Sequence, residues 1–190
     1  MKKITLIALA LVASFSTYAQ SVWTLDKSHA KLAFGVSHLL VSETEGDFTN
    51  FDVRIQSSKD DFIDAIVEVT ALTNSVNTEN ADRDKHIQSP DFFDAAKYPT
   101  LIFKSKSFKK VDGKNYKLVG DLTFHGVTKS VEFDVVFNGT AVHPYTKKTI
   151  AGFKLTGKIK RSDFGIGTAT PAAVVGDDVT ITSNLEVVKN

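Results

Sequence analysis

The segments 131-VEFDVVF-137 and 151-AGFKLTGKI-159 place an apolar residue at nearly every second position. Successive side chains of an extended chain point to opposite faces, so a period of two gathers the apolar side chains on one face. The residues on these two faces are Val131, Phe133, Val135, Phe137, Ala151, Phe153, Leu155, Gly157 and Ile159. The two segments therefore predict β-strands that each bury one face.

The same alternation occurs in six other parts of the chain, and turn residues separate them. The apolar faces are Ala30, Leu32, Phe34 and Val36 in a strand expected from Ser28 to His38; Phe51, Val53 and Ile55; Val67, Val69 and Ala71; Leu101 and Phe103; Tyr116, Leu118, Leu122 and Phe124; and Val179, Ile181, Leu185 and Val187. Asp112-Gly113 and His125-Gly126 have the composition of hairpin turns. About eight antiparallel strands predict an all-β fold, either a sandwich or a barrel.

The sandwich and the barrel differ in what they can hold. A sandwich fills its interior with its own side chains, whereas an eight-stranded barrel can enclose one ligand. Six phenylalanines fall on predicted inward faces: Phe34, Phe103, Phe124, Phe133, Phe137 and Phe153. Such rings can form the wall of an apolar binding site, or they can pack against one another as an ordinary core. The alternation leaves both interpretations open.

One long segment, from Glu79 to Pro99, lacks the strand pattern. The charged run Ala81–Ile87 predicts a short helix, and a second turn is expected over Asp91–Ala96 between two prolines. An insertion of this length in a β protein more often covers or gates a site than merely connects two strands.

The N-terminus has the three parts of a secretory signal peptide. Two lysines precede an apolar stretch from Ile4 to Phe15, and the small residue Ala19 suits cleavage before Gln20. The apolar stretch is too short for a transmembrane helix, which needs about 20 residues, although a retained anchor is the alternative. We therefore expect residues 1–19 to be removed and residues 20–190 to form one exported domain, in the periplasm or secreted, without stable membrane insertion.

Composition excludes several classes of function. Without the two lysines of the leader, 21 basic residues face 22 acidic ones, so the charge favours neither nucleic acid nor an anionic surface. The chain has no cysteine, which excludes disulfides, thiol chemistry and cysteine metal sites. We expect no cofactor. We also expect no metal, because the histidines show no His-x-His or Glu-x-x-His spacing.

Four motifs in order resemble the YceI-like family. They are Trp23–His29 with Phe34, Val36 and His38; Asn80–His86 with Ser89–Asp94 and Lys97-Tyr98-Pro99; Gly120–Thr123 with Gly126–Lys129; and Arg161–Gly165 with Val175-Gly176-Asp177. The resemblance covers nearly the whole chain after the leader. It implies a lipocalin-like barrel of eight antiparallel strands, exported to the periplasm in many members. In some members the barrel holds a polyisoprenoid or another long-chain lipid. The resemblance implies no reaction.

Twelve residues are predicted to contact such a ligand: Phe34, Val36, His38, Arg83, His86, Phe92, Phe93, Tyr98, Phe103, Phe133, Phe153 and Phe164. Arg83 and His86 share a helix face and could meet a polar head group at the barrel mouth, since a guanidinium suits phosphate or carboxylate. Alternatively, they form an ion-pair network with Asp26 or Asp163. The adjacent rings of Phe92 and Phe93 should face different ways, so that one of them packs inward. The Tyr98 ring could cap the cavity. For each of these three rings, packing in the core is an almost equally good account.

We therefore predict an exported carrier, not an enzyme, whose partner is a polyisoprenoid, a quinone or a fatty-chain lipid. No catalytic residue is assigned, because Asp26 with His29 and Ser162 with Asp163 lack a third orienting group. Two alternatives stay open: an enzyme that acts on a lipid or isoprenoid head group through His38, Arg83 or His86, and a filled barrel that serves as a stress-related interaction module. Association into a homodimer also stays open.

Overall fold

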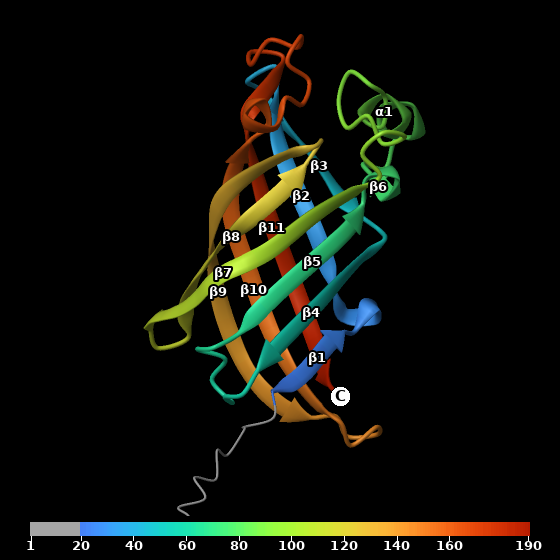
Figure 1. Cartoon of the computed structure of the whole chain (residues 1–190). Coiled ribbons are helices and arrows are strands. Elements are labelled where there is room, and N and C mark those ends of the chain that lie inside the picture. Colours follow the sequence, from blue (N-terminus) through green and yellow to red (C-terminus); the bar gives the residue numbers. More distant parts are fainter. Residues whose placement is uncertain (1–19) are drawn as a thin grey trace, which may run out of the picture.

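The structure, a computed structural model, describes residues 20–190, and its main element is one antiparallel sheet (Figure 1). The predicted signal peptide lies outside the described residues. The strands are β1 (Ser21–Leu25), β2 (Lys31–His38), β3 (Ser42–Phe48), β4 (Phe51–Ser57), β5 (Ile66–Leu72), β6 (Val76–Asn77), β7 (Thr100–Asp112), β8 (Asn115–Phe124), β9 (Val127–Val142), β10 (Thr149–Lys160) and β11 (Val175–Lys189). Short helices are η1 (Lys27–His29), η2 (Thr73–Ser75), α1 (Ala81–Ile87) and η3 (Arg161–Phe164).

The sheet closes into a barrel because β11 is paired on both sides. One edge of β11 pairs with β10, and the other pairs with β2 and then with β1, where Trp23 lies opposite Lys189. The closed ring runs β1-β4-β5-β7-β8-β9-β10-β11, which confirms the predicted eight-stranded antiparallel barrel.

Eleven strand segments fill eight places because three strands are interrupted. β1 and β2 pair one after the other with β11, β3 and β4 follow each other across residues 49–50, and β5 continues into β6 after η2. The predicted start at Ser28 is wrong: Asp26 accepts hydrogen bonds from the Ser28 backbone N–H (3.0 Å) and hydroxyl (2.6 Å) and turns Lys27–His29 into η1. The strand therefore begins at Lys31.

The insertion after β6 is the predicted helix. α1 spans Ala81–Ile87, and the Asn80 side chain caps it by accepting a hydrogen bond from the Arg83 backbone N–H (3.0 Å). Together with the loop between β10 and β11, it lies at the upper end of the barrel in Figure 1, which we call the mouth. Among residues 20–190, no helix has the length and apolar character needed to cross a membrane.

The opposite end, the base, is closed by Phe62. This residue lies in the turn between β4 and β5, is fully buried and has a backbone φ of 59°. Its ring centroid lies 5.0 Å from that of Trp23 and 5.1 Å from those of Phe137 and Phe153. These edge and tilted contacts are the favourable geometries for aromatic pairs, so four rings seal this end.

Asp64 fixes the turn that carries Phe62. Its carboxylate accepts hydrogen bonds from the hydroxyls of Ser57 and Ser58 and from the Ser58 backbone N–H (3.0 Å). Burial alone would raise the pKa of the Asp64 carboxyl, but these hydrogen bonds outweigh it and lower the pKa to about 2. A carboxyl whose folded pKa is lowered stabilises the fold above its unfolded pKa.

Asp64→Asn should therefore lower the free energy of unfolding at pH 7 by about 2 kcal/mol. The difference from the wild type should shrink as the pH falls from about 4 to 2, where the wild-type carboxyl becomes protonated. Urea unfolding, followed by the fluorescence of the single tryptophan, measures both values. Asp60→Asn, an exposed change in the same turn, is the control and should have little effect. A difference independent of pH would contradict the role of the carboxylate.

Candidate functional site

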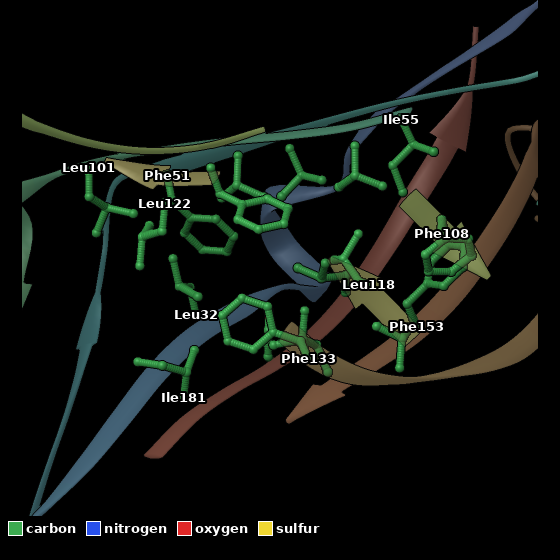
Figure 2. Close-up of a pocket in the computed structure, with 18 of the residues that line it drawn as sticks. Leu32, Phe51, Ile55, Leu101, Phe108, Leu118, Leu122, Phe133, Phe153 and Ile181 are labelled. Atoms are coloured by element: carbon green, nitrogen blue, oxygen red, sulfur yellow. The ribbon is translucent and has the colours of Figure 1, made fainter. Parts of the chain in front are cut away.

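The inside of the barrel contains a deep cavity with apolar walls (Figure 2). Its volume is about 110 Å³, and it is lined by inward side chains of β2 to β5 and β7 to β11. The labelled side chains in Figure 2, among them Leu32, Leu118 and Phe133, point into it from all sides. Its one polar wall residue, Ser183, already donates its hydroxyl proton to the Lys31 carbonyl (2.6 Å). Apolar cavities of this size stay dry and accept apolar guests.

A second, larger cavity of about 480 Å³ lies at the mouth. Four residues, Phe48, Phe124, Ile159 and Ile181, line both cavities, so the two spaces lie end to end along the barrel. The mouth cavity also has polar wall residues: Ser37, His38, Thr44, Arg83, His86, Arg161 and Thr170. The interior is thus an elongated space that is apolar at depth and polar near the mouth.

Ten of the twelve predicted ligand-contacting residues line these cavities. Phe34, Val36, His38, Arg83, His86, Phe92 and Phe93 line the mouth cavity, and Phe103, Phe133 and Phe153 line the deep one. Contact with a ligand remains a prediction for all of them. Phe92 and Phe93 do face different neighbours: the Phe92 ring packs edge-on against His86 at 5.0 Å, and the buried Phe93 ring lies 4.9 Å from that of Phe124.

Tyr98 and Phe164 lie outside the walls of both cavities. The Tyr98 ring packs against His125 at 4.7 Å and covers Gly126, whose φ of 74° turns the hairpin between β8 and β9. Tyr98 thus holds this hairpin and does not cap the cavity. Phe164 is buried behind the wall, with its ring centroid 6.2 Å from that of Phe124.

Arg83 is held by a threonine and not by the predicted carboxylates. Its Nε donates to the Thr78 hydroxyl (2.8 Å) and its Nη2 to the Thr78 carbonyl (2.7 Å), while the Thr78 hydroxyl donates to Asp84 (2.5 Å). Within residues 20–190, Arg83 forms no ion pair with Asp26 or Asp163, so the predicted ion-pair network is wrong. The other N–H groups of the Arg83 guanidinium have no hydrogen-bond partner within residues 20–190, so they are available to a ligand.

Arg161 is a functional candidate that the sequence analysis missed. Its side chain is buried, with 7% of the residue exposed, and it lines the mouth cavity. All five N–H donors of its guanidinium bond backbone carbonyls: those of Gly176 (3.0 Å), Ile166 (3.0 Å), Gly167, Thr170 (2.7 Å) and Val175 (3.0 Å). This cage holds the loop between β10 and β11 and leaves a positive charge beside the cavity.

Among residues 20–190, the permanent charges in the lining of the mouth cavity are those of the two arginines, and both are positive. Its walls include the side chains of Arg83, Arg161, His38 and His86, and none of the residues that line it is acidic. A site of this kind favours a head group that carries negative charge or hydrogen-bond acceptors.

A third polar cluster lies on the outside, where η1 meets β11. Ligand atoms of Asp26, His29 and Glu186 lie within 4.8 Å of one another. Hydrogen bonds from Ser28 and then His29 lower the pKa of Asp26 to about 2, and the Asp26 hydrogen bond and charge raise the pKa of His29. The cluster lines neither cavity. Its Asp26 caps η1 between β1 and β2, so the cluster has a structural role and forms no pocket for a substrate.

Arg161→Met should destabilise the protein by about 3 kcal/mol or more, because five buried or partly buried carbonyls lose their donor at once. Hydrogen exchange should show faster opening of residues 162–176, and urea unfolding measures the free energy. Lys158→Met, an exposed change on β10, is the matched control and should leave both quantities nearly unchanged. Exchange rates that stay at the wild-type level would show that the cage does not hold the loop.

The comparisons with known sequences agree across nearly the whole described chain. The model of the YceI-like domain matches residues 23–187. A UPF0312 protein of Staphylococcus aureus strain N315 is 34% identical over 168 residues, which cover 86% of this chain and 95% of that protein.

Solved structures show the same barrel. The crystal structure of the Campylobacter jejuni YCEI protein is 34% identical, with a TM-score of 0.71, and covers 81% of this chain and 90% of that one. A polyisoprenoid binding domain from Saccharophagus degradans, implicated in plant cell wall breakdown, has a TM-score of 0.66 and covers 88% and 98%. At 17% identity, this second likeness concerns the fold alone.

Proposed function

Since this chain belongs to the YceI-like family, we propose that it is an exported carrier that holds a long apolar molecule of the polyisoprenoid class inside its barrel. The observation that carries the proposal is the pair of cavities that lie end to end, with carbon-lined walls at depth and four cationic or titratable side chains at the mouth. This arrangement suits a ligand with a long hydrocarbon tail and a small polar head.

The energetics favour a tail that fills the depth of the barrel. Each buried methylene contributes about 0.8 kcal/mol, so a long tail binds tightly without any specific polar contact. The Phe62 seal ends the space at the base, and the tail must therefore enter from the mouth. The Saccharophagus degradans domain, described as polyisoprenoid binding, has the same fold, and we propose the same ligand class here by analogy of fold.

Export rests on the sequence of the leader. Residues 1–19 have the charge, apolar core and cleavage site of a signal peptide, which supports a location in the periplasm or outside the cell. The chain has no cysteine, so the oxidising conditions of these compartments can neither form a disulfide in it nor oxidise a thiol.

Binding accounts for the interior better than the two alternatives do. A filled barrel would leave no space, yet cavities remain even though rings such as Phe103 and Phe133 pack edge to face at 5.8 Å. For an enzyme, His38, Arg83 and His86 line the mouth cavity, but no carboxylate from the described part of the chain lines it with them. The arrangement of Ser28, Asp26 and His29 has suitable residue types, but it lies outside both cavities. The conclusion is a binding protein whose mouth orients a head group.

Native mass spectrometry of the protein purified from its own host tests the proposal directly. We expect a bound species in stoichiometric amount, and organic extraction should yield a lipid with a long prenyl tail. Quinones and fatty-chain lipids are the other ligand classes that the extraction would identify. A protein that is empty and takes up no prenyl chain from detergent would contradict the carrier function.

Ile181→Trp tests whether the tail passes from the mouth cavity into the deep one. Ile181 lines both cavities, so a larger ring there should block the passage and limit the length of the bound chain. Excluding only two methylenes weakens affinity roughly tenfold. Titration with prenyl alcohols of increasing length should show affinity that stops rising early. Ile66→Trp, the same change at an exposed position on β5, should bind like the wild type; equal length dependence in both variants would argue against a tail in the deep cavity.

A further inference from the structure

Three consecutive apolar side chains project from the turn between β2 and β3. Leu39, Leu40 and Val41 are 51%, 73% and 84% exposed. The turn lies at the mouth end of the barrel, beside the loop that joins β10 to β11 (Figure 1). We call these three residues the mouth tip.

The mouth tip is continuous with the wall of the mouth cavity. His38, the residue before it, lines that cavity. The Leu39 backbone N–H donates to the carbonyl of Val174 (2.9 Å), which also lines the cavity and is 38% exposed. An apolar surface of four residues thus borders the opening through which a ligand would pass.

The tip is unfavourable for the isolated fold on two counts. Its side chains stay in water, and Leu39 and Leu40 adopt φ values of 51° and 60°, in the left-handed region where a Cβ is crowded. Asparagine or glycine would suit this backbone better, and either would be more soluble. Local stability therefore does not account for two leucines and a valine here, whereas contact with an apolar phase does.

We propose that the mouth tip inserts into the interfacial region of a lipid bilayer and brings the cavity mouth against the membrane with which the protein exchanges its apolar ligand. This inference rests on the proposed carrier function. A long prenyl chain is nearly insoluble in water, so direct contact between mouth and membrane gives it a route that avoids water. Insertion of a few apolar side chains gives weak and reversible membrane binding, as a carrier needs.

Size and charge favour a bilayer over a protein as the occupant. A stable protein interface takes about 800 Å², or roughly 20 to 30 residues, from each partner, far more than the three residues of the mouth tip together with Val174. The cavity walls beside the tip carry the positive charges of Arg83 and Arg161, which are complementary to anionic lipid head groups, and no acidic residue that the structure describes lines these walls. Glu43, which follows the tip, folds its carboxylate back over Gly35 on β2.

The test compares two variants in vesicle flotation. The tip variant L39N/L40N/V41S removes the apolar side chains, and asparagine accommodates the positive φ values, so the turn should keep its shape. The control variant V142S/Y145S removes exposed apolar side chains at the base, where Val142 and Tyr145 are 63% and 90% exposed. Both are made in the chain that begins at Gln20, which contains every strand of the barrel.

Vesicles of phosphatidylethanolamine and phosphatidylglycerol in a 3:1 ratio, with no prenyl lipid, serve as the probe. We expect the wild type and the control variant to float with the vesicles and the partition coefficient of the tip variant to fall roughly tenfold or more. Equal flotation of the wild type and the tip variant, or none by the wild type, would overturn the proposal. A dimer that the tip variant alone converts to monomer, without flotation of the wild type, would assign the tip to a second copy instead.

Uptake of a prenyl alcohol from detergent separates this proposal from the carrier function. Detergent delivers the ligand without a membrane, so the tip variant should take up the ligand like the wild type. The rate at which the tip variant takes the ligand from vesicles should fall by the same factor as its partition coefficient. If the wild type took up no prenyl alcohol from detergent, the carrier function would be overturned. The flotation comparison would still decide by itself whether the tip contacts a membrane. Unchanged transfer from vesicles by the tip variant would overturn the role in exchange.

Discussion

The packing of Phe62 against Trp23, Phe137 and Phe153 determines what the barrel can hold. A barrel of eight strands is wide enough for either a filled core or one ligand, and the outcome depends on where the large side chains gather. Here four rings seal the base, so the space that remains lies above them and opens at the other end. The seal needs an unfavourable backbone at Phe62, and the hydrogen bonds of Asp64 hold the turn in that conformation.

The interrupted strands explain why the mouth is wider than the depth. Near the base, β1 and β4 complete a continuous hydrogen-bonded ring. Toward the mouth, β2 and β3 take their places, and the pairing ends at the two residues of β6, after which the α1 insertion begins. Side chains of the insertion therefore form part of the mouth wall, in place of a strand. This is why Arg83 and His86, which belong to no strand, line the cavity.

The sequence predicted the fold well because apolar and polar residues alternate within each long strand, a signal that needs no contact between distant residues. Each long strand shows its buried face directly, and Ala81–Ile87 shows its helix. The interruptions were missed because they depend on single contacts, such as the cap that Asp26 makes on η1, and because β3 (SETEGDF) has almost no apolar alternation.

Arg161 was missed for a different reason: its burial exists only after residues 162–176 fold around it, and an arginine at a strand end otherwise indicates a solvated charge. Tyr98 and Phe164 show the converse, because an aromatic residue in a motif says nothing about which layer it enters.

The hydrogen bonds of the mouth separate two kinds of positive charge. Every donor of Arg161 is used by a backbone carbonyl, so this guanidinium cannot bond a ligand without breaking the cage, and it acts on a head group through its field alone. Arg83 uses only part of its donors, and the exposed His86 ring contacts Phe92, so both side chains keep polar atoms that a head group can reach. A caged charge that does not rearrange selects the sign of the head group, while the unused donors bind its acceptor atoms. The apolar depth then sets how long a tail fits, so that tail length and head-group chemistry are recognised by separate parts of one cavity.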